Sequence, residues 1–406
     1  MKELTQHQVS AIDHLKKWRV GALFMEPGTG KTRVAVEIIR SCYDVDLVLW
    51  LGPLRTIRTE NGIKSVKDEV DKWGGFSSRA LYVGVESIGG SDRIYLETLN
   101  EISKYKRVFC VVDESLKIKN YQAKRTRRII HIGEQCHYRV ILNGTPITRN
   151  INDVWAQMQF LSPKILNMSY AQYERTFCKM TVLTKKIGGR KMWDKKIITG
   201  YENVDYLYSL IRHYIYQCDL HLNITQQYST MCYYISDIDR QEYDSIKEFY
   251  LSLDTLMSKN DNIFLEMTQK MQHSYCITED KFRCVDSIVE KNKEENCVIF
   301  CKYIVSAEEC KKRYPKALVM SYQKSAYGLN LQDYNVTVYF DKVWDYALRM
   351  QSSRRTYRTG QERDCHYYDL TGNVGLERLI DKNIEKKIGM SEYFKRATIN
   401  DLRKDL

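Results

Sequence analysis

Paired cysteines at metal-binding spacing are missing from this sequence. The twelve cysteines are scattered, and no CxxC pair occurs. Cys297 and Cys301 flank three apolar residues, so we expect them in a buried strand rather than in a metal knuckle. This usage favours a reduced, intracellular protein that employs thiols as small apolar side chains.

Long apolar runs are missing as well. No window approaches the ~20 apolar residues of a membrane span, and residues 1–6 contain no apolar signal region. We therefore expect a soluble protein that is not secreted and has no membrane partner.

The composition that remains is that of a globular protein with excess basic charge. The 406 residues are 43% hydrophobic and 28% charged, which allows a sizeable core. This length favours two lobes of roughly 150–200 residues. Lysine and arginine number 63 against 51 acidic residues, for a formal charge of +12. Such a surplus favours a polyanionic partner, although a basic but otherwise inert surface has the same composition.

In the first part of the chain, short apolar strands alternate with longer helical segments. Helical spacing marks residues 32–42 and 66–73. The predicted strands are residues 20–24, 47–51, 80–83, 108–112 and 139–142. Strands of continuous apolar character are typical of a parallel sheet covered on both faces. Residues 1–165 are therefore predicted to form a doubly wound α/β lobe.

A second α/β lobe is predicted over residues 226–406. Its expected helices are residues 239–256 and 282–293, and its expected strands are residues 298–301, 317–321, 336–340 and 365–370. Between the lobes, residues 166–225 form an expected insertion. It contains a hairpin that turns at Gly188 and Gly189, followed by a helical stretch over residues 204–216.

A glycine-rich turn lies between the first predicted strand and the first long helix. Gly28, Thr29, Gly30, Lys31 and Thr32 follow each other there. Such a turn lets backbone N–H groups surround phosphate oxygens at a helix N-terminus. Lys31 would reach the β- and γ-phosphates of ATP, and the Thr32 hydroxyl would bind Mg²⁺. The alternative is a chance glycine loop beside a lysine.

Two carboxylates in tandem end a predicted strand of five apolar residues. Acids at the carboxyl edge of a parallel sheet are well placed for a metal ion and water. Asp113 would hold the hydration shell of Mg²⁺, and Glu114 would orient the attacking water. A solvated turn is the alternative.

Three arginines crowd five positions near residue 355. Arg355 and Arg358 are three residues apart and are expected to share one helix face. A guanidinium from another lobe stabilises the charge that phosphoryl transfer spreads over the γ-phosphate. The competing interpretation is a surface salt-bridge cluster.

These segments, in this order, resemble the superfamily 2 helicase-like motors, and more specifically the Swi/Snf family of DNA-dependent ATPases. The matching segments are residues 4–8, 26–32, 52–55, 113–120, 142–147, 298–300, 328–332, 341–344 and 351–361. Residues 177–178 and 198–204 are similar to the fork-remodelling branch. The resemblance implies two RecA-like lobes with an ATP cleft between them, and ATP and Mg²⁺ as cofactors.

The resemblance also implies further site residues. Gln8 would read adenine, and Gly328 would contact the nucleotide. Nucleic-acid contact or coupling is implied for Arg55, Lys119, Gly144, Thr145, Asn330 and Trp344. In the expected hairpin, basic residues accompany Trp193 and would grip phosphates, unless the hairpin is a solvated loop: Lys185, Lys186, Arg190, Lys191, Lys195 and Lys196. A basic run after Glu114 has the same two interpretations: Lys117, Lys119, Lys124, Arg125, Arg127 and Arg128.

The chain departs from the family pattern at four places. Met25 replaces the first glycine of the GxxxxGKT pattern and stands where the family usually has an acid. Ser115 and Leu116 replace the usual Ala-His. Residues 216–219 lack the expected arginine pair and lysine, and the second lobe has a short stretch between Phe300 and Ser325. A minimal motor of this kind fits a virus or mobile element, and then the cytoplasm of a host cell.

The leading hypothesis is an ATP-dependent motor that translocates on duplex or branched DNA without reading its sequence. It would act as a monomer, with accessory replication or repair proteins as further partners. The alternatives are a strand-separating helicase, a nucleic-acid-binding scaffold with a decayed ATPase, and a P-loop kinase.

Overall fold

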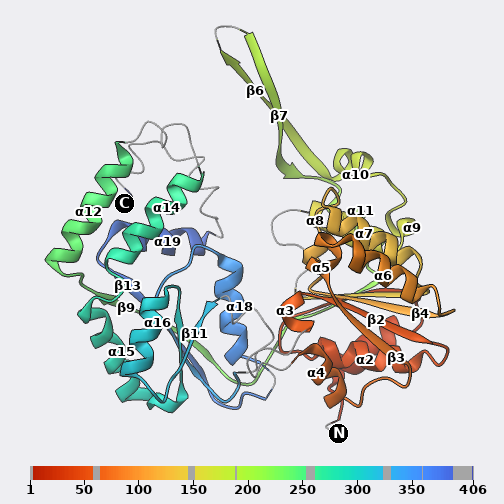
Figure 1. Ribbon diagram of the computed structural model, residues 1–406, viewed down its shortest axis with the longest axis horizontal. Helices are drawn as coiled ribbons and strands as arrows, with labels where there is room; N and C mark the ends of the chain where they lie inside the picture. The colour runs from red at the N-terminus through yellow and green to blue at the C-terminus, as the bar shows by residue number, and fades with distance from the viewer. Residues whose placement is uncertain are drawn as a thin grey trace. The chain divides into compact units, whose positions relative to one another are not determined.

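The computed structural model describes residues 3–57, 65–144, 151–187, 190–252, 261–322, 331–358, 360–386 and 405. The chain divides into two compact units, residues 1–220 and 221–406 (Figure 1). Each unit contains one parallel sheet, which confirms the expected α/β class. Among the described helices, none combines the length and the apolar character that crossing a membrane requires.

The first unit is built on a six-stranded sheet in which every neighbouring pair is parallel. The strand order is β3-β2-β4-β5-β1-β8. The strands are β1 (Val20–Met25), β2 (Leu47–Gly52), β3 (Arg79–Gly84), β4 (Val108–Asp113), β5 (Tyr138–Asn143) and β8 (Ile215–Cys218). The five strands expected from the apolar runs are therefore confirmed to within a residue or two.

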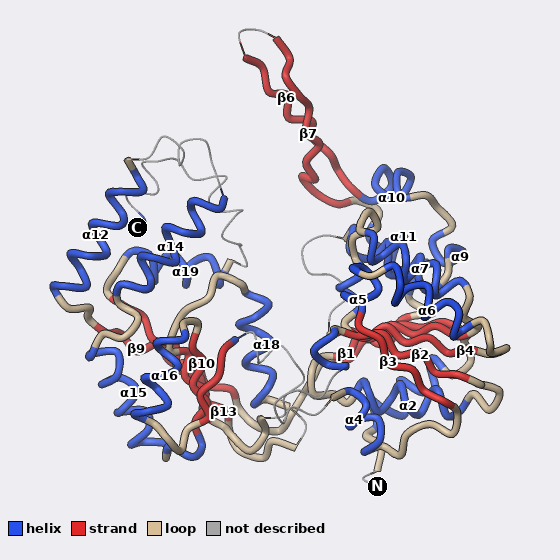
Figure 2. Tube along the Cα trace, in the orientation of Figure 1, coloured by secondary structure: helices blue, strands red, loops and turns tan. Residues whose placement is uncertain are grey.

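Helices cover both faces of this sheet, and Figure 2 shows the strands as a layer between them. Successive side chains of β2 point to opposite faces of the sheet, because a strand has a period of two residues. Leu47 and Leu49 pack on one face, and Val48 and Trp50 pack on the other. One face is covered by α1 (Gln6–Leu15), α2 (Lys31–Ser41) and α4 (Val66–Lys72). The other face is covered by α5 (Val85–Gly90), α6 (Asp92–Ile102), α7 (Lys124–Glu134), α8 (Asn152–Leu161), α10 (Tyr170–Phe177) and α11 (Val204–Ile211). The remaining short helices are α3 (Leu54–Ile57), η1 (Ser115–Ile118) and α9 (Pro163–Leu166).

An antiparallel hairpin interrupts the first unit. Its strands are β6 (Cys178–Ile187) and β7 (Arg190–Tyr201), and in Figure 1 this ribbon extends away from α10 and α11. The expected hairpin is thus present, while Gly188 and Gly189 lie outside the described residues. The helical stretch expected through residue 216 ends at Ile211. The chain then forms β8, because Ile215 and Tyr216 join the edge of the sheet beside β1.

The second unit carries a five-stranded parallel sheet of order β11-β10-β12-β13-β9. Its strands are β9 (Gln226–Tyr233), β10 (Cys297–Cys301), β11 (Leu318–Ser321), β12 (Val336–Tyr339) and β13 (Cys365–Gly372). Four of them follow the apolar runs. The sequence pattern missed β9, because five of its eight side chains are exposed on the sheet edge and carry no continuous apolar signal.

Most helices of the second unit pack into one apolar core on a single face of this sheet. They are α12 (Asp237–Leu251), α14 (Asp261–Ser274), α15 (Glu279–Asn292), α16 (Ile304–Arg313) and α19 (Gly375–Glu385), with the short helix η2 (Glu294–Asn296) after α15. The opposite face carries stacked aromatic rings, among them Phe300, Tyr339 and Tyr367. Helix α18 (Tyr346–Thr356) hydrogen-bonds to the hydroxyls of that layer.

Candidate nucleotide site

The glycine-rich turn that the sequence predicts to bind phosphate lies between β1 and α2. Gly28 and Gly30 have φ angles of 95° and 86°, values that side chains rarely allow. Gly30 also caps α2, which begins at Lys31. A Cβ atom on Gly30 would lie 2.3 Å from Nε2 of Gln8, so the position has no room for one. The turn therefore requires glycine twice, and it presents the N-terminus of an eleven-residue helix as an anion site.

Gln8 supports this turn from behind. Its side chain is 5% exposed. Its Nε2 donates to the Thr29 carbonyl at 2.9 Å, and its Oε1 accepts from the Thr5 N–H at 3.1 Å. Both ends of the amide are thus bound to protein, which fixes the turn. The role of Gln8 in reading adenine stays a prediction.

Glu26 and Met25 explain how the turn tolerates the loss of a glycine. The Met25 side chain is fully buried in the core between the sheet and α2. The carboxylate of Glu26 accepts from the Leu220 N–H at 2.9 Å, and its own N–H donates to the Cys218 carbonyl at 3.0 Å. Thr29 closes the turn, because its hydroxyl donates to the Glu26 carbonyl at 2.7 Å. Strand β8 thereby anchors the start of the turn, a contact that sequence spacing did not reveal.

The two predicted carboxylates stand at the carboxyl end of β4. Burial raises the pKa of Asp113 to about 7, helped by the charge of Glu114 and opposed by that of Lys31. The N–H of Glu114 donates to Oδ1 of Asp113 at 2.9 Å. Glu114 has φ 51° and ψ 55°, a left-handed conformation that costs a non-glycine residue free energy. This turn gives the two adjacent carboxylates different environments.

The strand register brings the separate segments to one edge of the sheet. Asp113 pairs with Leu142, and Phe24 pairs with Asn143, so the ends of β4, β5 and β1 are level. A Cβ on Gly144 would lie 3.2 Å from Cδ of Pro27, which places this residue against the phosphate-binding turn. A Cβ on Gly52 would lie 3.7 Å from Cβ of Asp113. The sites predicted from residues 28–32, 113–114 and 144 therefore form one cluster.

Ser115 links the carboxylate turn to α8. Its side chain is fully buried, and its hydroxyl donates to Oε1 of Gln157 at 2.6 Å. Lys119 forms an ion pair with Asp153 of the same helix at 3.5 Å. The departure from Ala-His thus gives the turn a hydrogen bond to α8. Gln157 has no sequence signal, because a single glutamine in an amphipathic helix looks like any surface residue.

Most of the basic run after Glu114 is paired within the unit. Lys117 lies 3.2 Å from Glu86. Burial raises the pKa of Glu86, but hydrogen bonds from the Leu54 N–H and Lys117 outweigh it and leave that pKa lowered. Hydrogen bonds from Arg128 and Lys124 lower the pKa of Asp92 to about 2.

Pairing with acids thus favours the structural interpretation for Lys117, Lys119, Lys124 and Arg128. Arg125 instead donates to the Lys117 carbonyl at 2.9 Å, and Arg127 is exposed. Arg55 is exposed on α3, which follows the Gly52 turn.

The arginine segment of the second unit differs from the expectation. Helix α18 ends at Thr356, so Arg358 lies beyond it and does not share a helix face with Arg355. The expected shared face is therefore wrong. Gln361 explains the early end: its Nε2 donates to the carbonyls of Gln332 and Tyr334 at 2.9 and 2.8 Å. These hydrogen bonds hold the chain after Thr356 against the segment that precedes β12. Arg355 itself is 7% exposed.

An aromatic layer positions α18. The guanidinium carbon of Arg349 lies 3.2 Å from the ring centre of Tyr339, and Arg349 bonds to Asp369 at 2.7 Å. The hydroxyl of Tyr367 donates to the Ser353 carbonyl at 3.1 Å. Tyrosines thus hold the helix that carries Arg355. The sequence contains 30 tyrosines, but their number alone did not predict this use.

Trp344 is placed in the core of the second unit. It is 9% exposed and packs edge-on against Phe264, with ring centres 6.3 Å apart. Nearby, Lys281 and Asp341 form a buried ion pair at 2.7 Å. The segment 341–344 is therefore packed inside this unit. The role of Trp344 in nucleic-acid contact or coupling stays a prediction.

Several predicted residues cannot be placed. Thr145, Gly328 and Asn330 lie outside the described residues, as do the side chains of the hairpin residues Lys185, Lys186, Arg190, Lys191, Trp193, Lys195 and Lys196. Their roles stay predictions.

The oxygen donors of the cluster fit a hard cation that also binds phosphate. Asp113, Glu114 and the Thr32 hydroxyl are the oxygen ligands that Mg²⁺ prefers. In the described part of the chain, no group of three or more His, Cys, Asp or Glu side chains is arranged to hold a metal. Mg²⁺ is usually held by one or two carboxylates together with water and phosphate oxygens.

Comparison with known proteins identifies the family. A family model described as the SNF2-related domain matches residues 87–297, slightly more than half of the chain. The chain belongs to the SNF2-related family. The match begins after the glycine-rich turn. The prediction for residues 25–32 is therefore supported by their sequence and geometry and not by the family match.

Similarity to individual SNF2-related proteins is distant. Nuclear protein STH1/NPS1 of Saccharomyces cerevisiae is 29% identical over 36% of this chain and 12% of its own length. Chromatin structure-remodeling complex protein SYD of Arabidopsis thaliana is 19% identical over 91% of this chain and 12% of its own length. The matched region thus spans about an eighth of these relatives. The SWI2/SNF2 ATPase core of Sulfolobus solfataricus in complex with dsDNA has a TM-score of 0.43 and 17% identity, covering 100% of this chain and 97% of that one.

Proposed function

We propose that this protein is a DNA-stimulated ATPase that uses ATP hydrolysis to translocate on duplex or branched DNA. The observation that carries the proposal is the cluster at one edge of the first sheet, where the glycine turn, Asp113, Glu114 and Gly144 meet in a chain of the SNF2-related family. A P-loop kinase would not account for the family match in the chain after residue 86.

We propose the following chemistry for the residues of the site. The N–H groups of the turn and Lys31 bind phosphate oxygens, while Thr32 and Asp113 hold Mg²⁺, largely through water. When bound, Mg²⁺ neutralises charge on the phosphates. Glu114 orients the attacking water, and Arg355 and Arg358 supply positive charge to the transferring phosphoryl group. Gln8, Gly28, Thr29, Gly30 and Gly328 complete the nucleotide site.

The proposed polymer is DNA bound without sequence preference. The net charge of +12 supports a polyanionic partner. The Sulfolobus protein named above was solved with dsDNA. We place phosphate contacts on Arg55 and on the hairpin cations, rather than on the internally paired Lys117, Lys124 and Arg128. The protein is further proposed to act inside a cell as a monomer, in a host cytoplasm if it is viral, with replication or repair proteins as accessory partners.

Turnover with different polymers tests the proposal. ATP hydrolysis should be measured with no polymer, single-stranded DNA, duplex DNA, forked DNA and RNA. We expect the largest stimulation with duplex or forked DNA and less with RNA. A protein that binds these polymers without any turnover would be a scaffold, and the proposal would fail.

Strand separation is the second candidate function. The antiparallel hairpin β6–β7 favours it, because such a ribbon offers a wedge at a fork. A labelled strand released from the forked substrate would identify a helicase. Turnover without strand release, together with displacement of a triplex-forming strand, would identify a duplex translocase.

A further inference from the structure

A second concave site lies at the opposite edge of the first sheet. Its volume is about 620 Å³, within the range of small-molecule sites. Val20 begins β1, Arg139 lies at the start of β5, and Tyr214 immediately precedes β8. The strands are parallel, so this pocket is at their amino ends. The nucleotide site is at their carboxyl ends, a six-residue strand or ~20 Å away.

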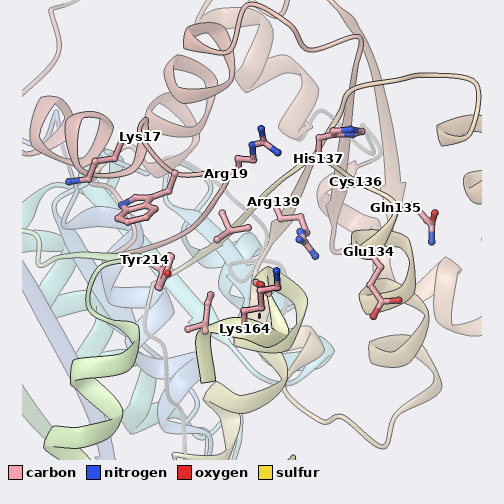
Figure 3. A pocket seen from close by; sticks show the side chains of 13 residues that line it. Lys17, Arg19, Glu134, Gln135, Cys136, His137, Arg139, Lys164 and Tyr214 are labelled. Carbon is pink, nitrogen blue, oxygen red and sulfur yellow. Dashed lines mark hydrogen bonds between the residues drawn. The ribbon is translucent and has the colours of Figure 1, made fainter. Parts of the chain in front are cut away.

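Four cations line the pocket against one carboxylate. They are Lys17, Arg19, Arg139 and Lys164, and the carboxylate is Glu134. Among the described residues, Lys17, Arg19 and Lys164 form no ion pair. Figure 3 shows Arg139 and Lys164 near the middle of the view. The pocket therefore concentrates positive charge that the protein does not neutralise.

Arg139 has a donor to spare. Its Nη1 donates to the Phe160 carbonyl at 3.3 Å, which holds the guanidinium in place. Its Nε is buried and has no hydrogen-bond partner among the described residues. The Arg139 side chain as a whole is only partly buried and lines the pocket. A guanidinium held in this way can offer its remaining N–H donors to a phosphate or carboxylate oxygen.

One wall of the pocket is aromatic. The rings of Trp18 and Tyr214 lie 5.2 Å apart and are tilted by 54°. Trp18 is 37% exposed, although large apolar side chains of this unit are mostly buried. In Figure 3 Tyr214 lies to one side of Arg139 and Lys164. The site thus combines a surface for a planar ring with a cationic end.

The geometry points to a second ligand site that binds a nucleoside phosphate. The phosphate is held by Arg139 and Lys164, and the base stacks on Trp18. A nucleoside phosphate carries a planar base for the aromatic wall and an anionic phosphate for the cationic end of this pocket. The volume of a mononucleotide also fits the cavity. The same chemistry is present in a free mononucleotide and in the 5′-phosphorylated end of a nucleic-acid strand. Besides Tyr214, the Trp18 ring has the Lys17 Nζ 5.8 Å from its centre. An acidic peptide would use the cations of the pocket without adding a planar ring that stacks on Trp18.

Titration calorimetry of the full chain with thymidine monophosphate tests the site. This probe lacks the β- and γ-phosphates that the glycine turn requires. We expect saturable binding that weakens roughly tenfold or more in Arg139→Gln/Lys164→Gln, because charge-assisted bonds are lost. Trp18→Ala should weaken the nucleotide but leave inorganic phosphate binding unchanged. Lys31→Ala should bind the probe as the parent does, which separates this site from the ATP site.

Two controls guard against trivial losses. Lys104→Gln/Lys106→Gln removes the same charge from exposed positions outside the pocket and should bind normally. Lys164→Gln alone changes an exposed side chain, so it keeps the test valid if the Arg139 variant fails to fold. Unchanged affinity in Lys164→Gln and the double variant, or an equal loss in the control, overturns the assignment.

Further probes distinguish the source of the ligand. A 5′-phosphorylated oligothymidylate that outcompetes its 5′-hydroxyl form identifies a strand end. Binding of the mononucleotide with no advantage for that oligonucleotide identifies a free nucleotide. Either result supports the site. Binding of an aspartate-rich peptide but of neither nucleotide probe overturns the proposal and identifies a protein surface instead.

Discussion

Glu114 sits at the junction between strand and turn in a conformation that few non-glycine residues adopt. Burial raises the pKa of its neighbour Asp113 to about 7, a shift that the sequence alone does not indicate. Local geometry also restricts position 30, because the Gln8 side chain occupies the space that a side chain on Gly30 would need. At the scale of residues, the site depends on local backbone geometry that no periodicity encodes.

The amide variant of Glu114 separates binding from chemistry. Glu114→Gln should bind ATP nearly as the parent does but hydrolyse it about 10²-fold more slowly or worse, because the water loses its orienting carboxylate. Lys31→Ala should instead weaken nucleotide binding. Equilibrium binding and steady-state turnover measure the two effects. Parental turnover in Glu114→Gln would remove this residue from the mechanism.

Asp113 should make stability depend on pH. Its folded pKa of about 7 lies above the ordinary value of 3.8, so the folded state holds its proton more tightly. Its stabilising contribution is present below about pH 4 and is lost as the pH rises through 7. A tenfold difference in proton affinity between the folded and unfolded states corresponds to ~1.4 kcal/mol. Without Mg²⁺ and nucleotide, urea denaturation should show the parent losing stability relative to Asp113→Asn between pH 4 and 7. If the free energies of unfolding of the parent and of Asp113→Asn changed with pH in parallel, the raised pKa would be contradicted.

At the scale of elements, the sequence predicted strands better than the ends of helices. The buried strands of both sheets are visible as apolar runs, whereas β8 and β9 lie at sheet edges and carry weaker signals. Helix α18 stops at Thr356 because Gln361 bonds to carbonyls some 30 residues earlier. Such an end depends on tertiary contacts, so periodicity alone placed Arg358 on the wrong element.

The buried pair of the second unit should dominate its stability. Lys281 and Asp341 are each 2% exposed, so Lys281→Ala leaves a carboxylate uncompensated in the core. We expect a loss of about 3–5 kcal/mol in the free energy of unfolding. Lys312→Ala, which breaks an exposed pair with Glu309, should cost under ~1 kcal/mol. Chemical denaturation measures both, and equal losses would refute the argument.

The hairpin and α7 should differ in their effect on DNA binding. Replacing Lys185, Lys186, Arg190 and Lys191 with Ser should weaken binding and flatten its salt dependence, because cations that contact phosphates release counterions from the DNA. Replacing Lys124 and Arg128 should have less effect, since Asp92 already pairs with both. Fluorescence anisotropy at several salt concentrations compares them. A larger loss of DNA affinity from the α7 substitutions than from the hairpin substitutions would contradict our assignment of the phosphate contacts to the hairpin.

At the scale of the whole molecule, the two units carry complementary parts of one proposed reaction. The first holds the phosphate turn and the carboxylates, and the second holds the arginines. Motif order along the chain predicted this division. The pairing of sheet edges that assembles the first cluster needed the strand register, which motif order does not contain.

Removal of one arginine tests whether the units cooperate. Arg358→Ala should lower DNA-stimulated turnover by about 10²-fold or more while ATP affinity changes little, because its charge acts on the transferring phosphoryl group. Arg354→Ala changes a neighbouring arginine that lies over the Tyr357 ring and serves as control. Equal turnover in both variants and the parent would reduce the segment to a surface cluster.

The bond between Leu220 and Glu26 has a mechanical consequence. Leu220 is the last residue of the first unit, and the chain passes from it into the second. We expect tension along that connection to reach the Glu26 carboxylate, which lies at the start of the proposed phosphate-binding turn. The connection between the units is thus hydrogen-bonded to the proposed nucleotide-binding turn. Strain in the connection should therefore distort that turn.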